Sequence, residues 1–283
     1  MKQKFKSTSG ITLLEMLIGV VISSIMMAAL YTSYTVVNGS YTQVADKETM
    51  SRTGRDIIGM LLRDIRMAGY YDVNAVQVAA PGMEPLFISK STRFTGDSRQ
   101  CDRIKIIYGD IEYNKGSTPE YTYPIYKVTY ECKRSKIPNR KVKKNAAGTF
   151  PTKDLFAIYK SKFSYDEKNR TWKDPTTDND VKTYKDELVI DHVEDLIFNP
   201  IDETGKQIKP APQPSNPRYY DIRSVDVLIM IRSPDPFYKK EKDRTQFALD
   251  PSAGNTRKKK SKDKYLRESI VVTAHTRNLG SLK

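Results

Sequence analysis

An apolar run near the N-terminus constrains this chain more than any other feature. Residues 11–31 read ITLLEMLIGVVISSIMMAALY and contain a single charged side chain, Glu15. As a helix rising about 1.5 Å per residue, the run is roughly 30 Å long, which is enough to cross the hydrocarbon core of a bilayer. A carboxylate inside a membrane helix costs free energy and by default marks a functional residue. Glu15 is therefore predicted to be functional and to have a partner.

The segment before the run does not follow the order of a secretory signal. Lys2, Lys4 and Lys6 make residues 1–10 basic, without any acidic residue, and such segments stay on the cytoplasmic side of a membrane. A secretory signal has its small-residue cleavage site after the apolar stretch, whereas here Gly10 stands directly before it. The order indicates a different kind of signal.

The residues Ser9 to Met16, SGITLLEM, resemble the class III signal of type IV pilins and type II secretion pseudopilins. The resemblance implies that a membrane-bound prepilin peptidase cleaves after Gly10 and methylates the new N-terminus at Ile11. It also implies that Glu15 pairs with the terminal amine of a neighbouring subunit during assembly. The family usually has phenylalanine where this chain has Ile11, a difference expected to weaken methylation more than cleavage. A plain signal anchor is the alternative.

A second helical pattern follows the apolar run. Apolar residues recur at steps of three and four, and charged residues lie outside their stripe, which predicts an amphipathic helix packed on a globular domain. Unbroken to Gly69, the whole helix would be about 90 Å long. Gly39, Gly54 and Gly59 favour bends or local unwinding, and Gly69 is placed to end the helix in a left-handed conformation. The stripe comprises Met50, Ile57, Ile58, Leu61, Leu62, Ile65 and Ala68.

Short β-rich segments separated by Pro, Gly, Asn and Ser follow residue 70. The expected fold class is therefore α+β: a long N-terminal transmembrane and amphipathic helix, as in the pilin fold, packed on a C-terminal antiparallel β-sheet domain. Residues 192–202 fit either a strand or a short helix. Strands are predicted at residues 103–108, 121–132, 155–159, 187–190, 224–232 and 269–277.

The chain is expected to have four parts. They are a cleaved leader at residues 1–10, the membrane and assembly half of the helix at 11–37, its amphipathic half at 38–70, and a β-rich periplasmic or extracellular domain at 71–283.

The two cysteines, Cys101 and Cys132, are predicted to form one disulfide. An even pair in a chain with an export signal favours a disulfide over zinc, which needs about four ligands. Two free buried thiols are the alternative.

Several later segments resemble minor pilins of the PilW type. They are LLRDIRMAGYYD at 61–72, the Ser/Cys/Asp loop at 98–102, the segment with Val193 and Phe198, the strand at 225–232, and the ending at Thr276 to Asn278. The J-type minor pseudopilin of type II secretion is a close relative in this respect. The resemblance implies a minor pilin that takes part in starting pilus assembly.

The PilW-type resemblance also implies partners and a location. The partners are the prepilin peptidase and other major and minor pilins, contacted through the N-terminal helix. The chain would cross the bacterial inner membrane once and then enter a pilus. A minor pseudopilin of type II secretion is one alternative, and a pilus-tip adhesin or DNA-binding subunit is another.

The net charge of +14 raises the question of anionic partners such as nucleic acid. The densest basic cluster is predicted to lie in a loop, and it could neutralise several phosphates in a salt-dependent way. Tyr265 is the one aromatic residue near it, so a stacking platform for single strands is not expected. A solvated loop without a ligand is the alternative. The cluster comprises Arg257, Lys258, Lys259, Lys260, Lys262 and Lys264.

No catalytic pattern is found in the sequence, and a non-enzymatic protein without a cofactor is expected. Neither His192 nor His275 has a nucleophile or metal-ligand spacing around it. Asp174, Asp178 and Asp180 offer oxygen ligands of the kind that calcium uses, but the glycine and terminal glutamate of an EF-hand are missing. Calcium and a solvated acidic turn are the two interpretations of this segment.

Overall fold

A computed structural model describes residues 12–70, 83–90, 101–136, 155–177, 182–209, 218–234, 236–238, 240–248 and 257–279. The chain forms two compact units, Met1–Glu48 and Thr49–Lys283. The first holds the apolar part of a helix, and the second holds the rest of that helix together with the strands.

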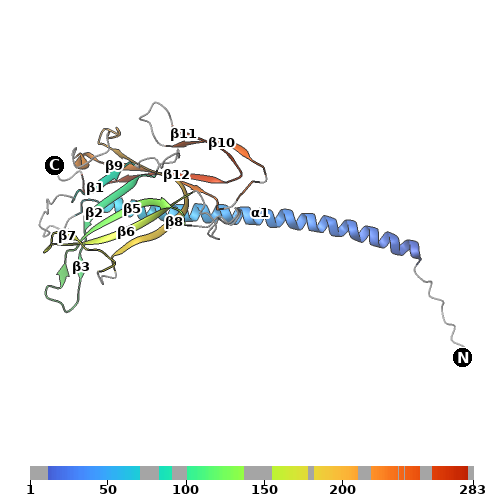
Figure 1. Ribbon diagram of the computed structural model, residues 1–283, viewed down its shortest axis with the longest axis horizontal. Coiled ribbons are helices and arrows are strands. Elements are labelled where there is room, and N and C mark those ends of the chain that lie inside the picture. The colour runs from blue at the N-terminus through green and yellow to red at the C-terminus, as the bar shows by residue number, and fades with distance from the viewer. Residues whose placement is uncertain are drawn as a thin grey trace, which may run out of the picture. The chain divides into compact units, whose positions relative to one another are not determined.

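The long helix, α1, spans Leu13–Met67 (Figure 1). Gly39, Gly54 and Gly59 all lie inside it without local unwinding. The helix ends as predicted: Gly69 has a φ of +73°, a conformation that glycine adopts at little cost. The N–H group of Gly69 donates to the carbonyl oxygen of Ile107 at 2.9 Å, which ties the end of the helix to a strand.

An antiparallel sheet forms most of the second unit (Figure 1). Its strands follow the order β1-β2-β5-β6-β8-β9-β12, and β7 pairs with β6 beside this path. The bounds are β1 Leu86–Ser89, β2 Arg103–Gly109, β5 Ile125–Arg134, β6 Phe156–Asp166, β7 Thr171–Trp172, β8 Tyr184–Ile201, β9 Ser224–Arg232 and β12 Arg267–His275.

Two small ribbons and one short helix complete the elements of the described residues. β3 (Glu112–Tyr113) pairs with β4 (Tyr121–Thr122), and β10 (Lys242–Ala248) pairs with β11 (Arg257–Asp263). A 3-10 helix, η1, spans Tyr219–Asp221. The predicted fold class, α+β with a long N-terminal helix and an antiparallel sheet, is confirmed.

The core of the second unit lies between one face of the sheet and the C-terminal part of α1. Leu61 and Ile65 are fully buried there in one cluster with Ile104, Val128 and Val227 of the sheet. Burying side chains of this size is favourable by about 1.5–3 kcal/mol each, which makes this interface the main source of stability.

One buried carboxylate joins the helix to the sheet. Asp64 of α1 accepts a hydrogen bond from the Tyr130 hydroxyl at 2.6 Å and pairs with Lys160 Nζ at 2.8 Å. Burial, and next the charge of Asp64, raises the pKa of the Tyr130 hydroxyl. The contact requires β5 and β6 to lie side by side under the helix.

The strands differ from the sequence prediction in several places. β1, β3, β7 and β10 lie where no strand was predicted, and β6 continues to Asp166, beyond the predicted end at 159. The ambiguous segment 192–202 is strand up to Ile201, and together with the predicted strand at 187–190 it forms the single long strand β8. The predicted strand at 121–132 is divided into β4 and β5. The basic cluster, expected in a loop, lies largely in β11, which pairs antiparallel with β10.

Candidate functional site

The apolar part of α1 is the candidate assembly surface. Within the described part of the chain, α1 is the helix that is long and apolar enough to cross a membrane. Its most apolar window has a mean hydropathy of 2.3, and none of it is buried. Its large apolar side chains are solvent-exposed, from Leu13, which is 83% exposed, to Tyr31, which is 71% exposed. A surface of this kind requires a lipid or protein partner.

Polar side chains inside this segment bond to the helix itself. The hydroxyls of Ser23, Ser24 and Thr32 donate to the carbonyl oxygens four residues earlier at 2.7, 2.7 and 2.8 Å. Because these hydroxyls already have acceptors, they add little to the cost of placing the helix in lipid. Glu15 is thus the group in this segment that most requires a partner.

Thr12 and Glu15 form a reciprocal cap at the first turn of α1. The Glu15 Oε2 atom accepts from the Thr12 N–H at 2.8 Å and from the Thr12 hydroxyl at 2.9 Å. The Glu15 N–H donates to Thr12 Oγ1 at 3.3 Å. This is the capping-box arrangement of a threonine followed three residues later by glutamate. It holds the carboxylate at the positive end of the helix dipole.

No cation in the described residues pairs with Glu15. The residues predicted for processing, Gly10 and Ile11, lie outside the described part of the chain. The cap formed by Thr12 lies downstream of the predicted cleavage position, so cleavage after Gly10 would leave both of its residues in the mature chain.

Cys101 and Cys132 form a disulfide, as predicted, and the alternative of two free thiols is wrong. Beside it, Asp102 is buried and pairs with Lys90 Nζ at 2.8 Å. Asp102 also accepts from the Phe198 N–H at 3.0 Å, and Lys90 donates to the Phe198 carbonyl at 2.6 Å. The disulfide and this ion pair together tie β5 and β8 to the beginning of β2. No pattern in the sequence identifies Lys90 as the partner of Asp102.

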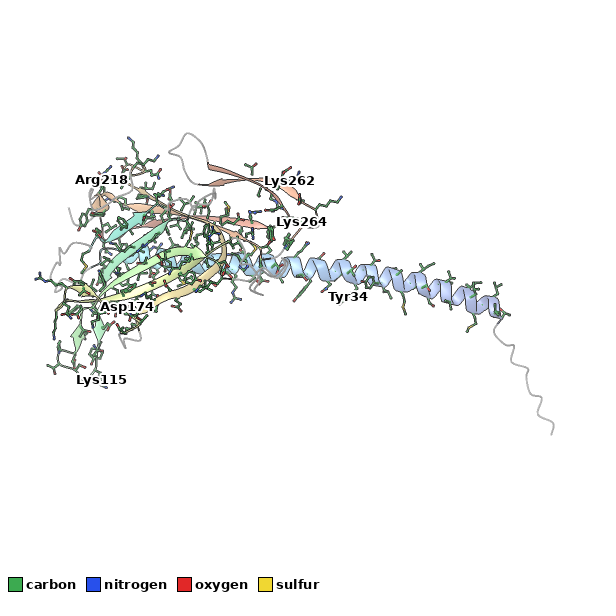
Figure 2. All side chains as sticks on the ribbon, viewed as in Figure 1. Tyr34, Lys115, Asp174, Arg218, Lys262 and Lys264 are labelled. Atoms are coloured by element: carbon green, nitrogen blue, oxygen red, sulfur yellow. A yellow bond between two sulfur atoms is a disulfide. The ribbon has the colours of Figure 1, made fainter. Side chains whose placement is uncertain are left out.

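The basic cluster lies on the β10–β11 ribbon and just beyond it. Lys262 and Lys264 are exposed and labelled in Figure 2. The side chains of Arg257, Lys258, Lys259 and Lys260 lie outside the described residues. At the root of the ribbon, Arg267 pairs with Asp263 at 2.6 Å and with Glu194 at 2.8 Å. Arg267 is almost fully buried, so it fixes the ribbon to β8.

Asp174 is the one member of the calcium candidate within the described residues, and Figure 2 labels it. Its carboxylate accepts from the N–H and hydroxyl of Thr176 at 3.0 and 2.9 Å, and it pairs with Lys185 at 3.0 Å. Of these contacts, the Thr176 N–H does most to lower the pKa of Asp174 to about 2. The described residues contain no group of three or more His, Cys, Asp or Glu that could hold a metal, and Asp178 and Asp180 lie outside them.

Comparison with known proteins bears on the N-terminus most directly. Residues 5–31 match the family model described as the prokaryotic N-terminal methylation motif. No curated protein matches the chain. Among solved structures, a type IV-like pilin from Thermus thermophilus is similar at 12% identity with a TM-score of 0.45, over 81% of this chain and 96% of that one. The chain therefore carries a prokaryotic N-terminal methylation motif, and that motif includes Gly10, Ile11 and Glu15.

Proposed function

We propose that this chain, which carries a prokaryotic N-terminal methylation motif, is a type IV pilin-like subunit that assembles through its N-terminal helix. The observation that carries the proposal is the combination, in one helix, of this motif with a fully exposed apolar surface that begins beside a capped carboxylate. Such a helix is suited first to lipid and then to the helices of neighbouring subunits.

Three residues have assigned roles in this proposal. Cleavage after Gly10 exposes a new amine on Ile11, which is methylated. Glu15 then pairs with the amine of a neighbouring subunit, whose positive charge compensates the carboxylate in an apolar surrounding. The prepilin peptidase and other pilins are the partners, and the location changes from the inner membrane to the fibre.

The finer proposal is that the subunit is a minor pilin of the PilW type that helps to start assembly. Its support is the order of segments from 61–72 to the Arg277–Asn278 ending. Asn278, in that ending, donates to the Arg66 carbonyl oxygen at 3.3 Å, so the two most family-like segments contact each other.

A minor pseudopilin of type II secretion is the nearest competing function, because it would use the same motif and helix. Deleting the gene and scoring surface pili beside secreted protein separates the two. We expect fewer pili with secretion unchanged. Lost secretion with normal pili would favour the pseudopilin, and no change in either would contradict assembly as the function.

The binding function, as a tip adhesin or DNA receptor, rests on the exposed Lys262 and Lys264. If this proposal is correct, changing both to glutamine reduces DNA uptake while pili remain. Equal uptake by the variant would contradict it.

Processing is tested on the chain itself. The tagged protein is produced with and without a prepilin peptidase, and its intact mass is measured. We expect the loss of residues 1–10 and the gain of a methyl group only when the peptidase is present. The variant Gly10→Val should keep the leader. A wild-type chain that retains its leader beside an active peptidase would contradict the proposal.

A further inference from the structure

The face of the sheet turned away from α1 is strongly cationic between β2 and β7. In β2 and β5 the residues that alternate with buried Ile104, Ile106 and Val128 project to this second face. The antiparallel register places Lys105 opposite Thr129 and Lys127 opposite Phe163. Side chains of three neighbouring strands therefore meet on one surface.

These side chains line an open groove of about 540 Å³. Five cationic residues contribute to it: Arg103, Lys105, Lys127, Lys133 and Lys185. Two acidic residues, Glu131 and Asp186, also line it. The volume lies within the range of ordinary small-ligand sites, and the positive charge exceeds the negative.

Most of these cations already have a carboxylate partner. Lys105 pairs with Glu84 at 2.7 Å, and Lys133 pairs with Asp186 at 2.6 Å. Lys185 pairs with Asp174 at 3.0 Å. Lys127 differs, because no carboxylate among the described residues pairs with it.

The Lys127 ammonium is instead held against two aromatic rings. Its Nζ atom lies 4.5 Å from the ring centroid of Phe163 and 4.5 Å from that of Trp172. Burial, followed by the charges of Lys105 and Arg103, lowers the pKa of Lys127 to about 8. The group therefore stays mostly charged at neutral pH in a position where an added anion would relieve repulsion.

The mixture of charges favours one ligand class over another. A nucleic acid backbone presents acceptors to the protein and would be repelled by Glu131 and Asp186. The ring faces on which its bases would stack are partly taken by Lys127, and Trp172 also packs against Tyr165 with centroids 5.1 Å apart. An acidic sugar carries a carboxylate for Lys127 and hydroxyl donors for the two acidic residues.

We propose that this groove binds an acidic saccharide, with a sugar carboxylate on Lys127 and sugar hydroxyls on Glu131 and Asp186. The site lies on the sheet, apart from the assembly helix. It adds to the proposed function a surface that recognises uronic-acid polymers.

The test measures binding of tetragalacturonate to the full chain in a non-ionic detergent by calorimetry. Galactotetraose is the neutral counterpart, and oligothymidylate of equal charge tests nucleic acid. We expect saturable binding of the acidic sugar and at least about tenfold weaker binding of the other two, because each lacks one part of the match.

Variants then locate the site. Lys127→Gln should weaken tetragalacturonate binding by at least about tenfold. The matched control is Lys115→Gln, which removes one positive charge from the exposed β3–β4 turn labelled in Figure 2 and should change affinity by less than about twofold. Arg103→Gln removes a largely exposed groove cation and should independently weaken binding by about threefold.

Three results would overturn the proposal. They are the absence of wild-type binding, equal losses in the groove variants and Lys115→Gln, and tighter Lys127-dependent binding of oligothymidylate. The last would assign the groove to a phosphate polymer. Because binding is measured without assembly or peptidase, its failure would leave the proposed pilin function unaffected.

Discussion

Under the proposed function, Glu15 would serve two purposes in succession. In this structure its carboxylate caps α1 through Thr12, with N–H to Oε2 at 2.8 Å. In a fibre it would pair with the amine of another subunit. The cap positions the carboxylate in advance, so less freedom is lost when the intersubunit contact forms.

Replacing Asp64 probes the contact that joins α1 to the sheet. Asp64→Ala should lower the free energy of unfolding by about 3 kcal/mol, because the mostly buried Lys160 loses its carboxylate and Tyr130 loses its acceptor. The matched control is Asp56→Ala on the exposed face of the same helix. Both substitutions replace aspartate by alanine in the same helix, so they change its helix propensity equally. The difference between their free energies of unfolding, measured by chemical denaturation, therefore reports the buried contacts of Asp64. Equal stabilities would contradict the role given to Asp64.

Lys127 predicts a pH dependence with a definite sign. Its folded pKa, about 8, lies below the ordinary value of 10.5 because of burial and then of Lys105 and Arg103 on β2. Phe163 and Trp172 face it from β6 and β7. Below pH 8 Lys127 is protonated in both states, and the unfavourable burial of its charge lowers the stability of the folded state in full. Between pH 8 and 10.5 the unfolded chain binds the proton and the folded chain does not, so the penalty is relieved.

The variant Lys127→Gln should therefore be more stable than the wild type at pH 7, by on the order of 1 kcal/mol after allowance for partial exposure. The difference should shrink as the pH rises from 8 towards 10. Urea denaturation of both proteins at several pH values measures it. A difference that stays constant, or grows with pH, would contradict the lowered pKa of Lys127.

At the scale of the elements, α1 lies close against the sheet at Gly54. A Cβ atom there would lie 2.3 Å from Ile270 Cδ1 and 3.1 Å from Ile231 Cδ1, whereas one at Gly59 would meet nothing within 4 Å. Gly54→Leu should cost about 2 kcal/mol through overpacking, while Gly59→Leu should gain up to about 0.8 kcal/mol from helix propensity. Thermal unfolding of the pair compares them, and equal shifts would contradict the packing.

How far the sequence predicts an element depends on how regular the element is. β9 was expected at 224–232 and lies there, because a short run of β-branched and other apolar residues buried on both faces leaves few other interpretations. β8 was predicted only in part. His192 has a φ of +63° and the register with β9 shifts between Val193 and Asp195, so the period on which the prediction relied is broken.

The strand β11 was not predicted because of its high charge. The lysine-rich residues of β11 have the composition of a loop, and only pairing with β10 makes them a strand. The cationic groove could not be predicted from the sequence either, because it depends on strand pairing. Lys127 and Trp172 are far apart in the chain, and the register of β5, β6 and β7 brings them together. The cysteine pairing was predictable because two cysteines allow one bridge.

The whole second unit should depend on the disulfide for part of its stability. Cys101 and Cys132 are separated by 31 residues, and closing such a loop stabilises a folded chain by about 3 to 4 kcal/mol in the chain-entropy account. Replacing both cysteines by serine should lower the free energy of unfolding by that order. Reductant should lower the melting temperature of the wild type and leave that of the variant unchanged. A reductant effect on the variant would contradict this assignment.

The central claim concerns the whole molecule as a subunit of a fibre. Its most direct test measures the mature chain in sheared surface fibres and in the membrane for wild type, Glu15→Ala, and the control Glu48→Ala, which removes an exposed acid elsewhere in α1. We predict that Glu15→Ala is inserted and cleaved but stays in the membrane, while the other two enter fibres. Fibres containing normal amounts of the Glu15→Ala chain would contradict the account.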